Sequence, residues 1–260
     1  MNPVYHVPPR DLSTLKAKLN SVGWFMPPYV TVGFLDMVAL CVEEAAGQFT
    51  QDDLERVLAT VYGPKRLASM VLNRYPRIPI ISLYAETIAE AVLAHFIGLH
   101  HVAVGGLIPV IEGVGRRLAG ERGLDKDGHT KDVFRSLAAF AEEDVIKRRI
   151  GATSEIVDML DSFNRFVEEY FYTSSQAYPL VDGTNRHGIA HGAYTDAEYG
   201  RPINFYKTIA ALDFLTFISS LKTTTASGFV PEDTQESTSL AARYIAMGNV
   251  SATESGQAAR

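Results

Sequence analysis

The sequence predicts an all-α protein, and three observations support this fold class. Apolar residues recur three and four positions apart through almost every segment, which is the spacing of one face of a helix. No segment shows the alternating β-branched pattern and hairpin turns that are typical of strands. With 260 residues, 47% of them hydrophobic, the chain can bury a substantial core, so a wholly disordered chain is excluded. We therefore expect a multi-helix bundle.

The first part of the chain predicts short helices separated by turn residues. The Pro27-Pro28 pair precedes an apolar helical segment that Gly47 ends. Thr50, followed three residues later by Asp53, has the form of a helix N-cap with a carboxylate in the first turn. The helices expected in this part cover residues 11–20, 29–47, 51–63 and 64–75.

Two prolines in the sequence RYPRIP, residues 74–79, mark a candidate domain boundary. Beyond it we expect longer helices near residues 80–98, 101–120, 130–149, 153–172 and 203–221, with a polar, turn-prone interruption before the last of them. We therefore divide the chain into an N-terminal helical extension (1–78), a helical bundle (79–222) and a flexible or loosely docked C-terminal tail (223–260). Within that tail, residues 239–248 fit one docked helix.

A stretch of 21 residues, 91–111, carries no formal charge and approaches the length of a membrane-spanning helix. Three histidines, three glycines and Pro109 within it favour a pair of buried core helices instead. The single cysteine, Cys41, cannot form an intrachain disulfide, and the first residues lack the apolar core of a secretory signal. We expect a cytoplasmic protein without a membrane partner.

The charge of the chain limits how it can bind nucleic acid. With 30 acidic and 24 basic side chains, the net charge of −6 provides no basic surplus that would attract a polyanion over long range. Any contact with RNA must therefore be local and depend on a few arginines and helix ends. Candidates for such a local track are Arg116, Arg117, Arg122 and Lys147-Arg148-Arg149.

The candidate site lies in the polar interruption, in the sequence NRHGIAH. Thr184 or Asn185 can cap a helix that begins here, and free N–H groups in its first turn favour an anion. Arg186 adds a permanent bidentate donor suited to phosphate. His187 and His191 are four residues apart, so both imidazoles project from one helix face and can transfer protons near neutral pH. These residue types suit metal-free RNA cleavage.

Two carboxylates in apolar segments also need partners. Glu112 has two interpretations: an ion pair with Arg116 one helical turn later, or a contact that orients the Arg186 and His191 cluster. Asp213 interrupts the apolar pattern of the last long helix and could accept a hydrogen bond from a motif histidine. For Asp213 we instead expect a carboxylate on the helix surface.

The segment Arg186-His187-x-x-x-His191, between two long helices, resembles the Arg-x4–6-His motif of the HEPN superfamily. The residue after the arginine in that motif is usually Asn, Asp or His, and His187 fits this position. The flanking sequences GGLIPVIEGVGRRLAGERG and NFYKTIAALDFLTFI look similar to the helices around the motif in uncharacterised bacterial HEPN-like proteins. The resemblance covers about residues 80–222 and leaves residues 1–78 unexplained.

The resemblance implies a bundle that forms a homodimer, with two motifs in one cleft that binds RNA and commonly cuts it without a metal or other cofactor. Arg186 would hold the scissile phosphate, His191 would act as general base or acid, and His187 would assist. Asn185 lies just outside the motif and, with Glu112, is a supporting candidate. Many HEPN proteins belong to toxin–antitoxin, abortive-infection or CRISPR systems, so an antitoxin or another protein partner is a further expectation.

Two alternatives from other classes stay open. The first is a non-catalytic helical module that binds a nucleotide or a protein in the same pocket. The second is a metalloenzyme, because His187 and His191 have the helical spacing of zinc ligands and a third ligand could come from Glu112, Glu168 or Glu169.

Overall fold

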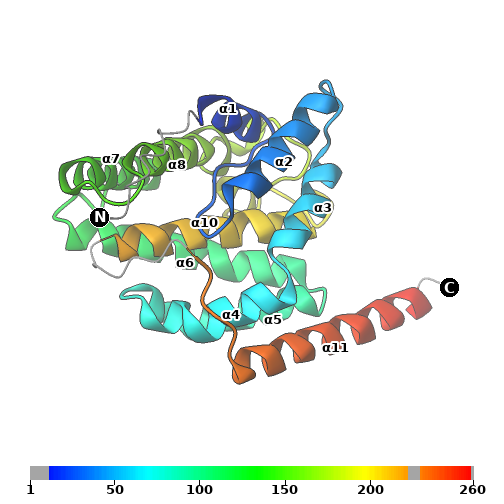
Figure 1. Ribbon diagram of the computed structural model, residues 1–260. Helices are drawn as coiled ribbons and strands as arrows, with labels where there is room; N and C mark the ends of the chain where they lie inside the picture. Colours follow the sequence, from blue (N-terminus) through cyan, green and yellow to red (C-terminus); the bar gives the residue numbers. More distant parts are fainter. Residues whose placement is uncertain (1–11, 222–228, 259–260) are drawn as a thin grey trace, which may run out of the picture.

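The computed structural model in Figure 1 describes residues 12–221 and 229–258, with side chains up to residue 250. The described residues form helices and no strand, so the all-α fold class is confirmed. The helices are α1 (Ser13–Ser21), α2 (Val32–Glu44), α3 (Gln51–Val61), α4 (Pro64–Asn73), α5 (Ala85–Phe96), α6 (His100–Glu121), α7 (Thr130–Arg148), α8 (Thr153–Phe166), α9 (Arg186–Ala190), α10 (Pro202–Ser220) and α11 (Gln235–Ala258).

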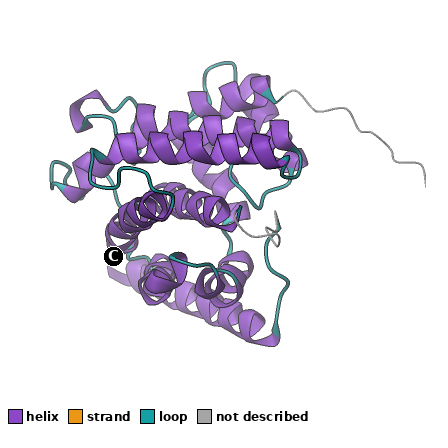
Figure 2. Ribbon diagram, turned by 90° about the vertical axis from the view of Figure 1, so that its left-hand side faces the viewer, coloured by secondary structure: helices purple, strands orange, loops and turns teal. Residues whose placement is uncertain are grey.

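Helix α10 lies at the centre of the molecule. Every residue from Ile203 to Ser220 is buried, because α10 packs on α6 and α3 and other elements cover its remaining faces. A helix that is apolar on all sides needs such neighbours all round. In Figure 1, α7, α8 and α1 lie above α10 and α6, and α4, α5 and α11 lie below them. Figure 2 shows the same arrangement as two groups of helices, one above the other.

One hydrophobic core extends from Leu12 to Tyr244. Trp24 and Phe25, in the expected N-terminal extension, are fully buried within it. The rings of Phe25 and of Phe214 in α10 have centroids 5.8 Å apart. The extension therefore packs directly on the bundle. The division of the chain into three parts remains a prediction.

Helix ends follow the sequence signals in most places, with one difference at α2. Thr50 and Asp53 form a reciprocal capping box at the start of α3, with N–H to side-chain oxygen distances of 2.9 and 3.2 Å. The helix expected from Tyr29 begins instead at Val32. The reason is that Tyr29 has a positive φ of 63° and the Thr31 hydroxyl caps the first turn.

The uncharged stretch 91–111 forms parts of two helices, as expected. Gly98, with a φ of 82°, ends α5, and α6 begins two residues later. In the described part of the chain, none of the helices has both the length and the apolar character needed to cross a membrane.

The C-terminal part contains a long helix, α11, which packs on α4 and α5. Tyr244 is buried, and its ring stacks on Phe96 with centroids 4.6 Å apart. The docked helix expected at residues 239–248 therefore lies within a longer helix, α11. Residues 223–228 and 259–260 of the expected tail lie outside the described residues.

The expectation for Asp213 was wrong. Its carboxylate is fully buried and accepts hydrogen bonds from the Tyr75 hydroxyl at 2.7 Å and from Arg66 Nη2 at 3.2 Å. Burial raises the pKa of Asp213, and the Arg66 guanidinium and the Tyr75 hydroxyl oppose this effect. The carboxylate joins α10 to α4, a contact between segments that are distant in sequence.

Candidate functional site

The motif lies on α9, a five-residue helix in the long connection between α8 and α10. Asn185 is fully buried and fixes this helix in place. Its Oδ1 accepts from the Gly188 N–H at 2.8 Å, and its Nδ2 donates to the carbonyls of Tyr170 and Thr173 at 3.0 and 2.9 Å. Asn185 is therefore the N-cap of α9, as the sequence predicts, and its side chain uses the Gly188 N–H.

A buried ion pair holds the connection just before α9. Lys207 Nζ, in α10, lies 2.9 Å from Asp182 Oδ2 and 2.8 Å from Gln51 Oε1, and the two charged side chains are fully buried. Asn204 Nδ2 donates to the Thr184 hydroxyl at 2.8 Å. Burial tends to raise the pKa of Asp182, but the Lys207 ammonium and the Thr184 hydroxyl hold it below its usual range. This network joins the connection to α3 and α10.

Glu112, on α6, contacts Arg186. Its two carboxylate oxygens accept from Nε and Nη2 of the guanidinium, with 3.0 Å between Nη2 and Oε2. Both side chains are less than one-fifth exposed. Arg116, the other candidate partner of Glu112, instead donates to the Gly128 carbonyl at 3.1 Å and to the Thr130 hydroxyl at 2.8 Å.

The remaining terminal nitrogen of Arg186 contacts both motif histidines. Nη1 lies 2.8 Å from His191 Nε2 and 3.3 Å from His187 Nδ1, and the two imidazole rings stack 5.7 Å apart. Because a guanidinium only donates hydrogen bonds, both of these ring nitrogens are acceptors and therefore unprotonated. Burial, followed by the charge of Arg186 and the proximity of His191, lowers the pKa of His187, which favours its neutral form.

A pocket of about 570 Å³ opens beside Arg186 and His187. The loop before α7, the start of α7, Arg116 and Tyr172 form its other walls. His191 does not line this pocket and is exposed to solvent. Of the basic track proposed from the sequence, only Arg116 lines it. Its lining residues are Arg116, Asp127, Gly128, His129, Thr130, Lys131, Tyr172, Arg186 and His187.

No pattern in the sequence pointed to Tyr172 or to the loop 127–131 as part of the site. Tyr172 ends the helical segment that leads out of α8, where an aromatic residue is expected to be part of the core. Only the folding of α6, α7 and α9 against one another brings these residues to the motif.

The side chains do not form the metal site of the second alternative. Within residues 12–221 and 229–250, no three His, Cys, Asp or Glu side chains are placed to hold a metal ion together. Glu112 is bound to Arg186, and Glu168 is bound to Arg135 at 2.5 Å. The Arg186 guanidinium donates to the two imidazole nitrogens that a shared metal would need.

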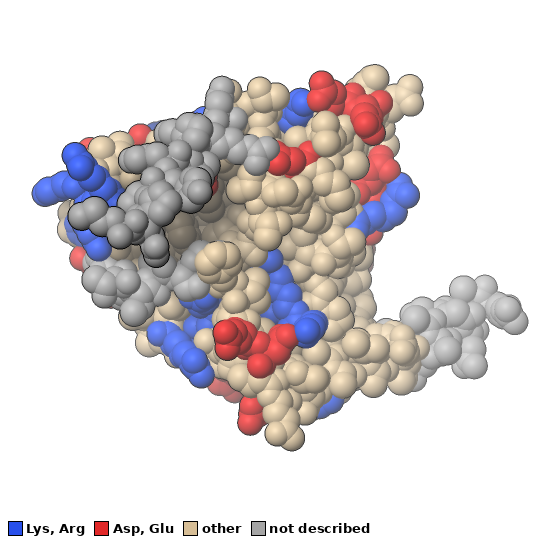
Figure 3. Space-filling view, in the orientation of Figure 1, with Lys and Arg blue, Asp and Glu red and all other residues tan. Residues whose placement is uncertain are grey.

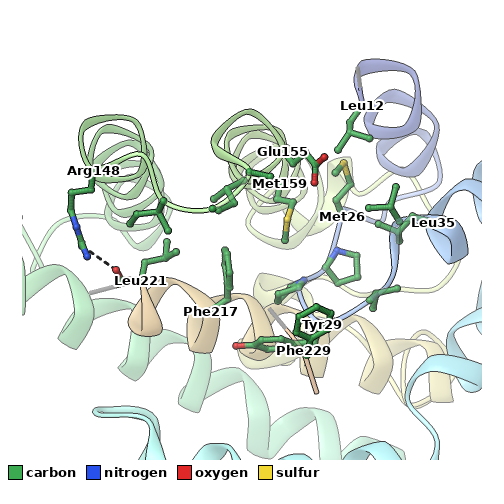
Figure 4. Close-up of a pocket in the computed structure, with 18 residues that line it drawn as sticks. Leu12, Met26, Tyr29, Leu35, Arg148, Glu155, Met159, Phe217, Leu221 and Phe229 are labelled. Atoms are coloured by element: carbon green, nitrogen blue, oxygen red, sulfur yellow. Dashed lines mark hydrogen bonds between the residues drawn. The ribbon is translucent and has the colours of Figure 1, made fainter. Parts of the chain in front are cut away.

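A larger pocket of about 650 Å³ lies away from the motif, between the loop before α2, the start of α8 and the end of α10. Figure 4 shows that mainly apolar side chains surround it and that Arg148 points to the carbonyl of Leu221, at 3.0 Å. Its lining residues include no His, Cys, Ser, Thr or Lys. Glu155 and Tyr29 are the lining side chains that could transfer a proton, and no histidine accompanies them.

Comparison with known proteins identifies no relative of this chain. No family model matches it, and neither a curated protein nor a solved structure matches it. The candidate site is therefore argued from its own geometry and chemistry.

Proposed function

We propose that this chain is a metal-independent endoribonuclease of HEPN type, in which Arg186 holds the scissile phosphate and His191 transfers a proton. One observation carries the proposal: a single guanidinium is fixed by Glu112 on one side and lies within hydrogen-bond distance of one ring nitrogen of each motif histidine on the other. A fixed cationic donor to phosphate next to two proton-transfer groups is what cleavage of an RNA phosphodiester requires.

In the proposed reaction the ribose 2′-oxygen attacks the adjacent phosphorus, and the bond from phosphorus to O5′ breaks. His191 Nε2 accepts the proton of the 2′-hydroxyl, and water supplies a proton to the departing O5′. The products are a 2′,3′-cyclic phosphate and a 5′-hydroxyl, so atoms and charge balance. The Arg186 guanidinium stabilises the negative charge that builds up on the phosphoryl oxygens.

Binding of the phosphate prepares the base in this mechanism. Without RNA, His191 Nε2 accepts a hydrogen bond from Arg186 Nη1. When a phosphoryl oxygen takes that N–H, the imidazole nitrogen becomes free to accept the 2′-hydroxyl proton. Glu112 acts as a positioning residue because it binds Nε and Nη2 and leaves Nη1 facing the histidines.

The surface charge supports an RNA contact of short footprint. On the face shown in Figure 3, basic and acidic side chains form small groups, several of them side by side, and the part not covered by grey atoms has no broad basic surface. RNA would therefore be held by a few contacts at the motif, with a shallow dependence of affinity on salt.

We further propose that the protein acts in the cytoplasm as a homodimer in which two motifs share one cleft. Light scattering at the concentration used for the cleavage assay is expected to give twice the mass of the chain. A monomer at that concentration would contradict the shared cleft.

The cleavage test uses purified protein and RNA in the presence of a chelator. The wild type is expected to cut, and Arg186→Lys and His191→Ala are expected to lower the rate by about 100-fold or more. Arg186→Lys keeps the positive charge beside Glu112 but removes the planar bidentate donor. The matched control is Arg165→Lys, because Arg165 is exposed on α8 and its closest ion-pair distance is 3.7 Å.

The same assay contains the result that would overturn the proposal. RNA that stays intact with a wild type of normal helical circular dichroism would exclude the nuclease, and RNA bound but uncut would favour the non-catalytic module. Equal loss of cleavage in Arg165→Lys would show that the effect is not specific to the motif.

A further inference from the structure

Two cations in the pocket beside Arg186, Arg116 and Lys131, form no ion pair with a carboxylate of the described residues. Arg116 donates only to backbone carbonyls and to the Thr130 hydroxyl. Lys131 Nζ donates to the backbone carbonyl of Glu168 at 3.1 Å. Neither cation has an ion pair within the described residues, and Asp127 is the single carboxylate that lines the pocket.

The start of α7 adds unpaired donors at the same place. This helix has 19 residues, and no side chain caps its first turn. The N–H groups of Asp132 and Val133 both donate to the His129 carbonyl, whereas those of Thr130 and Lys131 have no acceptor within the described residues. The partial positive charge of this helix end therefore faces the pocket. Anions bind at such helix ends when other donors accompany them.

Tyr172 provides an independent indication that a ligand belongs here. It lines the pocket and is only 4% exposed. Its buried hydroxyl lacks a hydrogen bond of normal geometry within the described part of the chain. Burial, followed by the nearby Glu112 carboxylate, raises the pKa of Tyr172 well above its usual range, so the hydroxyl remains a donor. A bound anion would give this buried hydroxyl an acceptor with normal hydrogen-bond geometry.

We propose that this pocket binds the phosphate of the nucleotide next to the scissile one, with Arg116, Lys131, the first turn of α7 and the Tyr172 hydroxyl as its donors. The inference rests on the proposed ribonuclease function for the identity of its natural ligand. Arg186 lines the pocket and also contacts both motif histidines, so one RNA strand can place adjacent phosphates in the pocket and at the motif.

Inorganic phosphate is the probe for the pocket alone. Calorimetric titration, with chloride at matched ionic strength, is expected to show saturable binding to the wild type and about tenfold weaker binding to Lys131→Gln, since one charge-assisted contact is lost. The matched control is Lys147→Gln, which makes the same change at an exposed position near the other end of α7. Equal affinity in the wild type and Lys131→Gln, or no binding to the wild type, would overturn the proposal.

Tyr172→Phe separates a ligand contact from a structural role. If the hydroxyl binds phosphate, this variant loses affinity for inorganic phosphate, while the free energy of unfolding without phosphate stays unchanged or rises. If the hydroxyl instead supports the fold through Glu112, the variant is less stable and phosphate affinity is unchanged. That second pattern would remove Tyr172 from the site.

Cleavage kinetics test the proposed phosphate site and the proposed nuclease activity separately. Lys131→Gln is expected to raise KM about tenfold with little change in kcat, because the contact is made equally in the ground and transition states. Phosphate binding that depends on Lys131 in a protein that cuts no RNA would support the pocket and exclude the nuclease. RNA cleavage with KM and phosphate affinity unaffected by Lys131→Gln would exclude the pocket and leave the nuclease standing.

Discussion

At the scale of single residues, the buried pair of Lys207 and Asp182 fixes the segment that leads into the motif. Both side chains have no exposed area, and their other partners come from α3 and from the connection itself. The attraction within a buried pair mainly offsets the cost of removing both charges from water, so it adds little net stability. Its main effect is to hold the two segments together, because either charge left alone would be buried without a partner.

Lys207→Met is expected to lower the free energy of unfolding by about 3–5 kcal/mol, since it leaves the Asp182 carboxylate buried and unpaired. Urea denaturation measures this loss. The double variant Asp182→Asn/Lys207→Met is expected to be more stable than Lys207→Met alone, because no buried charge then remains. A double variant as unstable as the sum of the two single variants would contradict the coupling.

His95 makes the stability of the fold depend on pH, and this effect does not involve the motif histidines. Its ring is buried and stacks on Phe205 with centroids 3.9 Å apart, and its Nδ1 lies 3.2 Å from that of His100. Burial, with a smaller effect of His100, lowers the pKa of His95 to about 3. The folded protein therefore keeps this imidazole neutral where the unfolded chain binds a proton.

This difference sets the direction of the pH effect. The contribution of neutral His95 to the free energy of unfolding is complete above the ordinary histidine pKa of about 6.5. It is lost as the pH falls toward the pKa of His95 in the folded protein. Between about pH 7.5 and pH 5 the wild type is expected to lose about 2 kcal/mol more stability than His95→Phe. Urea denaturation at the two pH values measures the difference, and parallel losses in both proteins would contradict the lowered pKa.

At the scale of elements, two glycines in helices have different reasons for being glycine. A Cβ on Gly188, in α9, would lie 2.3 Å from the ring of Tyr194, so close packing requires the missing side chain. A Cβ on Gly105, in α6, would meet nothing within 4 Å. The absence of a side chain at Gly188 therefore has a packing explanation, whereas its absence at Gly105 has none in the structure.

Gly188→Ala is expected to destabilise the protein by about 1–3 kcal/mol despite its higher helix propensity, because Tyr194 must move. The matched variant Gly105→Ala is expected to stabilise it by about 1 kcal/mol through helix propensity alone. Thermal unfolding of the two variants compares them directly. A shift of both in the same direction would show that the contact with Tyr194 does not decide the effect.

At the scale of the whole molecule, the continuous core links the expected extension, the bundle and α11. Trp24 is the single tryptophan of the sequence and lies fully buried in the extension, whereas most of the helical signal comes from the rest of the chain. Tryptophan fluorescence therefore reports on the extension, and far-ultraviolet circular dichroism reports mainly on the other helices of the same core.

Unfolding in urea is expected to give the same midpoint by tryptophan fluorescence and by far-ultraviolet circular dichroism, since one core unfolds cooperatively. Trp24→Phe serves as the control that assigns the fluorescence change to this residue. An earlier transition by fluorescence than by circular dichroism would instead support the boundary near residue 78.

The sequence alone determined the helical class, the positions of most helices and the residues of the motif. These features depend on local information: apolar spacing of three and four, the Thr50 capping box, and a histidine pair placed one turn apart beside an arginine.

Tertiary structure alone decided which partners those residues meet. Glu112 is 74 positions from Arg186, and sequence spacing left its partner open between Arg186 and Arg116. Asp213 is buried where Arg66 of α4 and Tyr75 donate to it across the core, and the donors of the pocket beside Arg186 converge because α6, α7 and α9 meet there. Local patterns fix the face of a helix, but long-range packing decides which charges are buried together, and burial sets their chemistry.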